Sequence, residues 1–150
     1  MTTRLPVRNN THTTLAIYWL PAVVWAVVIS AVSHIPAPEL EKAADAVGPV
    51  PIALDIAYHV SVFGVMGALA HWVASRHLGS HAKWSYFAPL AFAIGYGVID
   101  EFHQSFVAGR SAAAEDVGYD SIGAVIGIAA IIAVRFALSR TKRGPTTGRS

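Results

Sequence analysis

Four long blocks of apolar residues follow one another along the chain, and polar or charged segments separate them. The blocks cover Leu15–Val32, Ile56–Ala74, Trp84–Ile99 and Val117–Leu138. About 20 residues of α-helix cross a hydrocarbon layer roughly 30 Å thick. At this length only helices satisfy their backbone polar groups within one segment, and the blocks lack the alternation of barrel strands. The pattern therefore predicts an all-α integral membrane protein with four transmembrane helices.

The segment between the first two blocks, residues 34–51, contains one further helical pattern. Leu40, Ala43, Ala44 and Val47 recur at helical spacing among charged residues, with prolines near both ends of the segment. This pattern is typical of a short amphipathic helix on the membrane surface, here on the outer side. The predicted organisation is an N-terminal tail over residues 1–14, a single membrane domain over residues 15–138 and a basic C-terminal tail over residues 139–150.

The composition supports a membrane protein. Hydrophobic residues make up 54% of the chain and charged residues 13%, and the mean hydropathy is +0.49. Soluble domains carry roughly 25% charged residues, so a soluble enzyme, a disordered chain and a nucleic-acid-binding protein are excluded. The chain has no cysteine, which excludes disulfides, thiolate catalysis and cysteine-ligated metals.

Charged residues are divided unequally between the two sides of the predicted bundle. With four spans, both termini and the second loop share one side, which receives nine of the 11 basic residues. Lys42 and Arg110 fall on the other side, together with all nine carboxylates. The positive-inside rule then places both termini in the cytoplasm. His71, His77 and His81 lie toward that side, where interfacial or solvated roles are expected.

Polar residues gather at the outer ends of three predicted spans. In each span these residues are spaced three or four positions apart, so they share one helix face. The members are Asp55 and His59 in the second span, Gly97, Asp100, Glu101 and Gln104 in the third, and Asp116 and Asp120 in the fourth. Gly123 and Gly127 continue the last face inward, and glycines at this spacing let helices approach closely. Because charged groups at membrane depth cluster in the bundle interior, we expect one network.

The connection between the third and fourth spans is expected to be tight. The helical pattern of the third span can continue to Gly109 as its C-cap, and Ser111 can then cap the next helix. The resulting antiparallel hairpin would bring Asp100, Gln104 and Arg110 close to Asp116 and Asp120. Adding Asp55 and His59 to this group requires that the second span packs against the hairpin.

Two roles are open for Arg110. It lies with Ser111 at the start of the fourth span, where free N–H groups and the helix dipole favour an anion. A planar guanidinium there suits a phosphate or carboxylate ligand, with Gln104, Asp116 and Asp120 completing a ligand-binding site. The alternative is an ion pair with Asp116 or Glu115.

Three further interpretations of the acidic groups remain open. Asp55, His59, Asp100 and Glu101 are candidates for acid–base catalysis, but no nucleophile is recognisable, and enzymatic activity stays undecided. Carboxylates and imidazole can bind a divalent cation; without a metal-binding spacing signature, neither a metal nor a cofactor is expected. The third interpretation is a buried polar network that only fixes the hairpin.

The order of these motifs resembles the VanZ-like family of small bacterial membrane proteins. The motifs are Asp55-x3-His59, Asp100-Glu101-x2-Gln104, Gly109-Arg110-Ser111 and Asp116 followed by Gly123. Ser33 also resembles a polar position of the family. The chain departs from the family pattern at Ile56, Ala108 and Asp120, where Lys, Pro and Asn are usual, so its site is more acidic.

The resemblance implies a bacterial envelope context and a link to teicoplanin-type glycopeptides. The function expected is recognition of an anionic envelope lipid or a lipid-linked cell-wall intermediate, with an effect on glycopeptide sensitivity. The alternatives are a membrane-embedded hydrolase or transferase acting on such a substrate, and a structural scaffold. The expected partners are membrane lipids, a lipid-linked cell-wall precursor or a lipoglycopeptide, and no nucleic acid. The oligomeric state is left open.

Overall fold

The chain forms five α-helices in a computed structural model that describes residues 11–45, 52–80 and 82–141. The helices are α1 (Thr11–Ser33), α2 (Ala37–Asp45), α3 (Ile52–Leu78), α4 (Trp84–Gln104) and α5 (Ala114–Thr141). The described residues contain no strand, which confirms the all-α prediction. Residues 11–14 belong to α1 and residues 139–141 to α5, while the rest of both predicted tails lies outside the described ranges.

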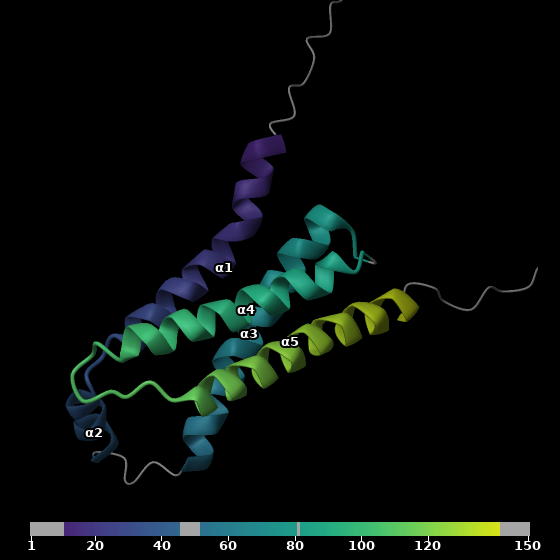
Figure 1. Cartoon of the computed structure of the whole chain (residues 1–150). Coiled ribbons are helices and arrows are strands. Elements are labelled where there is room, and N and C mark those ends of the chain that lie inside the picture. Colours follow the sequence, from purple (N-terminus) through teal and green to yellow (C-terminus); the bar gives the residue numbers. More distant parts are fainter. Residues whose placement is uncertain (1–10, 46–51, 81, 142–150) are drawn as a thin grey trace, which may run out of the picture.

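Helices α3, α4 and α5 pack together, and α1 lies along α3 and α4 with less contact (Figure 1). The buried core is small and apolar, and consists of Ile29, Phe63, Met66, Ala93 and Ala124. Many large apolar side chains point outward instead, among them Val27, Phe87 and Ile126. Exposed apolar faces on several helices are expected where lipid, and not water, surrounds the bundle.

The closest packing joins α3 and α5, which run in the same direction. Val60 lies against Gly123, and Gly64 lies against Gly127, so closely that a Cβ on either α5 glycine would overlap the α3 backbone. The sequence predicted that the Gly123–Gly127 face packs against a neighbour, and the structure identifies that neighbour as α3. This parallel contact sets the register that brings the polar first turns of both helices together.

Two helices, α3 and α5, are long and apolar enough to cross a membrane. A third candidate is the pair formed by residues 18–33 and 37–43, if both sides of its 90° bend are counted as one span. Helix α4 is not among the candidates. Its sequence contains the less apolar residues Trp84, Ser85, Tyr86 and Pro89 near its start and ends in Asp100, Glu101 and Gln104, and these residues lower its mean hydropathy. Two or three candidate spans are therefore found where four were predicted.

The amphipathic helix predicted between the first two spans corresponds to α2, which follows α1 after a sharp corner. The backbone of this corner is bonded to the loop between α4 and α5: Ala37 N donates to the carbonyl of Ala108, 3.1 Å away. Val47, which was assigned to the same helical pattern, lies outside the described residues. The corner thus closes over the loop that carries Arg110.

The end of α4 differs from the prediction. The helix ends at Gln104, and residues 105–113 form an irregular connection before α5 begins at Ala114. Gly109 adopts a positive φ of 76°, as expected for a glycine turn, but it lies in this loop and does not cap the helix. The prediction of a helix running to Gly109, with a tight turn capped by Ser111, is therefore wrong. Ser111 is exposed in the loop, before α5 begins.

The opposite end of the bundle contains buried polar contacts. His71 is only 1% exposed, and its Nδ1 lies 2.6 Å from the backbone carbonyl of Ser85. Arg135 Nη1 donates to Ser75 Oγ at 2.7 Å. The interpretation of His71 as interfacial or solvated is wrong, because α4 packs over it and supplies a backbone acceptor.

Candidate functional site

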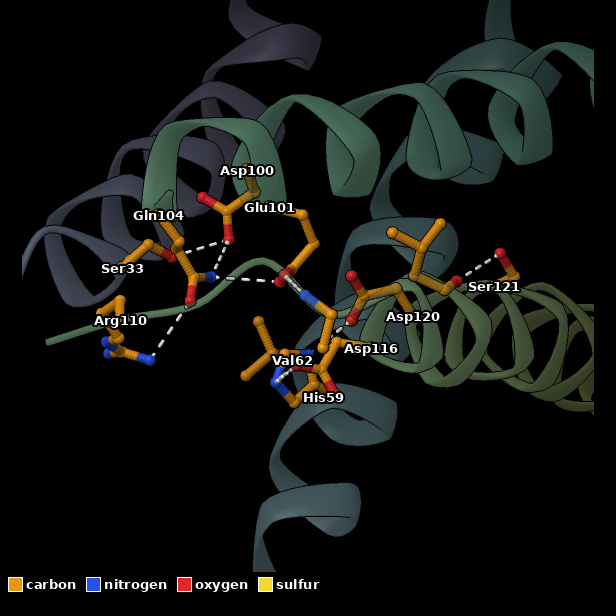
Figure 2. Close-up of polar contacts among 12 residues, drawn as sticks. Ser33, His59, Val62, Asp100, Glu101, Gln104, Arg110, Asp116, Asp120 and Ser121 are labelled. Atoms are coloured by element: carbon orange, nitrogen blue, oxygen red, sulfur yellow. Dashed lines mark hydrogen bonds and ion pairs between the residues drawn. The ribbon is translucent and has the colours of Figure 1, made fainter. Parts of the chain in front are cut away.

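Four helices meet at one end of the bundle and bring their polar residues together. We call this region the polar end; it comprises the last turn of α1, the first two turns of α3 and of α5, and the last two turns of α4. Figure 2 shows side chains from these elements converging on a common space. They form two adjoining groups, one around Asp100 and one around His59.

The first group is organised by the buried carboxylate of Asp100 on α4. Ser33 Oγ donates to Asp100 Oδ2 at 2.7 Å, and Gln104 Nε2 donates to the same oxygen at 3.1 Å. Gln104 in turn accepts a hydrogen bond from Arg110 Nη1 at 3.2 Å. Arg110 Nε also donates to the carbonyl of Ile35 at 3.3 Å. This chain of bonds connects α1, α4 and the following loop (Figure 2).

Glu101 joins the same group and also binds the start of α5. Its Oε1 accepts from Gln104 Nε2 at 3.3 Å, and its Oε2 accepts from the backbone N–H of Ala113 at 2.9 Å. Ala113 directly precedes the first residue of α5, where backbone N–H groups lack partners within the helix. Glu101 therefore caps α5 from a neighbouring helix, the role that the sequence suggested for Ser111.

The second group is built on the pair His59 and Asp120. His59 Nδ1 lies 2.9 Å from Asp120 Oδ1, and Asp120 is only 1% exposed. Because an ionised carboxylate only accepts hydrogen bonds, Nδ1 is the donor. The other ring nitrogen, Nε2, lies 3.9 Å from Asp116 Oδ2. Asp55 completes the group: ligand atoms of Asp55, His59 and Asp116 all lie within 4.8 Å of one another.

The two groups meet at Gly97 on α4. A Cβ on this residue would lie 2.9 Å from Asp120 Oδ2, so the missing side chain makes room for the Asp120 carboxylate beside α4. Gly97, Asp100, Glu101 and Gln104 are all buried on one face of α4, as the spacing predicted. The structure thus brings the predicted residues together as two groups in contact; Asp55 belongs to the second group but is exposed.

Arg110 does not form either of the predicted ion pairs. Within residues 11–45, 52–80 and 82–141, no carboxylate lies within salt-bridge distance of its guanidinium. Its hydrogen bonds go to the neutral Gln104 amide and to a backbone carbonyl. The sequence placed Gln104 near Arg110, but it did not indicate the carbonyl of Ile35, because the side-chain pattern carries no information about a backbone acceptor in a distant corner.

A pair of histidines lies beside the first group. His34 Nδ1 and His103 Nε2 are 3.2 Å apart, and both residues are exposed. The pair further connects the corner after α1 to the end of α4. The two histidines are 69 positions apart in the sequence, and the spacing of residues within one helix gives no reason to pair them.

Fold and site together define a helical membrane protein in which buried carboxylates, one histidine and one arginine gather at one end of the bundle. Residues 8–136 match the model of the family described as VanZ/LLP1. The chain belongs to this family, which confirms the resemblance drawn from its motifs. No curated protein and no solved structure matches the chain significantly.

Proposed function

We propose that the chain spans the bacterial cytoplasmic membrane four times, with both termini in the cytoplasm and the polar end facing outward. There it binds the anionic headgroup of an envelope lipid or of a lipid-linked cell-wall intermediate. By occupying or sequestering that lipid, it alters sensitivity to teicoplanin-type glycopeptides. Family membership supports the envelope setting, and the unequal distribution of basic residues supports the orientation.

The observation that carries this proposal is the state of Arg110. Its guanidinium is half-buried, fixed by two hydrogen bonds, and without a carboxylate partner among the described residues. Asp100 and Glu101 belong to the same group, but their carboxylates accept hydrogen bonds from Ser33, Gln104 and Ala113. A fixed guanidinium with remaining donor capacity suits the oxygens of a phosphate group.

An apolar cavity beside the polar end supports a lipid ligand. A space of about 350 Å³ lies between α1 and α4, and Trp19, Ala22, Val23, Ala26, Val27, Ser30, Phe92 and Tyr96 line it. Ser30 lies one helical turn before Ser33, and Tyr96 lies one turn before Asp100. An acyl chain in this cavity would therefore point its headgroup toward the first polar group.

The test compares Arg110→Lys and Arg110→Ala with the parent chain at matched expression. Co-purified anionic lipid is measured by mass spectrometry, and glycopeptide sensitivity is measured in cells. Lys offers a point charge in place of a two-pronged donor, so we expect both variants to lose about tenfold in lipid recovery. Lys42→Ala is the control, because Lys42 is exposed and pairs with Glu39.

Parent-like behaviour of Arg110→Lys would contradict bidentate binding by Arg110. Loss of expression in both Arg110 variants would instead favour the scaffold alternative, in which the network only holds the helices together.

A second candidate function is a membrane-embedded hydrolase or transferase on the same class of lipid. The observation that favours it is the His59–Asp120 pair, since a buried carboxylate on one ring nitrogen orients the other as a general base. Release of a cleaved headgroup by the purified chain, abolished in His59→Gln, would support this candidate over simple binding.

A further inference from the structure

The group around His59 carries more negative charge than a histidine can balance. Asp55, Asp116 and Asp120 surround one imidazole. Even a protonated ring would leave two of the three carboxylate charges uncompensated. Arg110, the basic residue of the polar end, is bonded to Gln104 and to the Ile35 carbonyl instead. Carboxylates grouped in this way at a helix-bundle end call for a cation.

The geometry of His59 matches that of a metal-ligating histidine whose second ring nitrogen is hydrogen-bonded to a carboxylate. Asp120, almost fully buried, accepts a hydrogen bond from the Nδ1–H group and leaves the Nε2 lone pair facing Asp116. The 3.9 Å separation between Nε2 and Asp116 Oδ2 is too long for a hydrogen bond. His59 itself is 93% buried, with a relative exposure of 7%. A carboxylate behind a ligating histidine is the usual arrangement that fixes the ring and raises its basicity.

The spacing of the three ligand atoms also fits an ion. In a tetrahedral site with bonds of about 2.0–2.1 Å, ligand atoms lie about 3.4 Å apart. The ligand atoms here lie within 4.8 Å of one another, and the His59–Asp116 pair is already at 3.9 Å. Small rotations of Asp55, which is exposed, and of Asp116, which is partly exposed, would close the remaining gap.

We infer that Asp55, His59 and Asp116 bind one divalent transition-metal ion, Zn²⁺ or Mn²⁺, with Asp120 as the positioning residue. One imidazole nitrogen with two carboxylates favours these ions over Mg²⁺, which prefers oxygen ligands alone. Three protein ligands leave a coordination position open on the exposed side of Asp55. This inference stands independently of the proposed function, although an ion there would give an acidic site affinity for phosphate oxygens.

The experiment titrates the purified, chelator-stripped full chain with Zn²⁺ and Mn²⁺ by calorimetry in detergent. Because His34 and His103 could bind Zn²⁺ on their own, all variants carry His103→Gln. We expect one saturable site, with at least tenfold weaker binding in Asp55→Asn and in Asp116→Asn. Asp120→Asn is expected to weaken binding about 10–100-fold by releasing the ring.

Glu115→Gln is the matched control, since it removes an exposed acid beside Asp116 without touching the cluster. Its affinity should equal that of the background. The visible spectrum of bound Co²⁺ provides a second measurement, and His59→Gln should change it by removing the nitrogen ligand. Unaltered affinity in Asp55→Asn, an exposed position where folding is not at risk, would overturn the inference. So would the absence of a saturable site in the background protein.

Discussion

The carboxylate of Asp120 occupies the space that a side chain on Gly97 would need. A Cβ at residue 97 would lie 2.9 Å from Asp120 Oδ2 and 3.3 Å from a ring carbon of Phe63. Gly97 on α4 thus contributes to the group around His59 on α3 and α5 by leaving space for Asp120, although it has no side chain of its own. Any residue larger than glycine must move the carboxylate that holds His59.

We therefore predict that Gly97→Ala destabilises the protein through Asp120. The expected loss is about 1–3 kcal/mol in the free energy of unfolding, since the clash is with a buried, bonded group. In an Asp120→Ala background the same substitution should be much less harmful, because the obstructing carboxylate is gone. Intrinsic tryptophan fluorescence during thermal unfolding in detergent measures both effects. Gly95→Ala, with nothing within 4 Å of its Cβ, is the control.

The parallel contact of α3 with α5 leads to a second prediction. A Cβ on Gly127 would overlap the backbone of Gly64, so Gly127→Ala must separate the two helices. We expect a stability loss of about 1–3 kcal/mol together with weaker pairing of His59 and Asp120. Gly118→Ala on the same helix meets nothing within 4 Å and should be neutral or stabilising by up to about 1 kcal/mol. Equal behaviour of the two variants would contradict the packing.

A third prediction concerns the cap that Glu101 provides for α5. Glu101→Ala should cost about 1–2 kcal/mol, the usual effect of losing a side-chain cap, whereas Glu101→Gln keeps an acceptor and should cost less. Amide hydrogen exchange at residues 113–117 is the measurement, and faster exchange is expected in the alanine variant. Glu115→Ala removes an exposed acid from the same turn and should leave the exchange of Ala113 unchanged.

The proposed orientation makes a fourth prediction. Because the chain has no cysteine, single cysteines can be introduced at Ala43 and at Ser150 without a background signal. A membrane-impermeant thiol reagent added to intact cells should label residue 43 and spare residue 150. Labelling of residue 150 together with protection of residue 43 would contradict the proposed orientation and indicate the opposite one.

Much of the polar end could be predicted from helical spacing. The pairs Asp55–His59 and Asp116–Asp120, and the α4 face from Gly97 to Gln104, follow from residues three or four apart. The glycines of α5 likewise predicted a close neighbour. These features are local to one helix, so the order of residues encodes them directly.

The features that could not be predicted depend on contacts between distant segments. The sequence did not indicate that Gly127 lies against Gly64, because a helix face of small residues can pack closely against any of several neighbouring helices. For Arg110 it left open an anion ligand or an ion pair with a nearby acid, and it did not indicate the carbonyl that the corner at Ile35 supplies. The end of α4 was misplaced because apolar residues continue through the loop, and Glu101 from the preceding helix, not a local residue, caps α5.

The corner between α1 and α2 has three contacts with the end of α4 and the loop that follows it. The Ala37–Ala108 backbone bond and the Ile35–Arg110 bond reach the loop, and the His34–His103 pair reaches the last turn of α4. Helix α2 is short and follows directly from this corner, where the carbonyl of Ile35 accepts a hydrogen bond from the Arg110 guanidinium. The position of the Arg110 guanidinium therefore depends on α1 and α4 together, so a displacement of the corner at Ile35 would reach Gln104 and the buried carboxylate of Asp100 through hydrogen bonds already present.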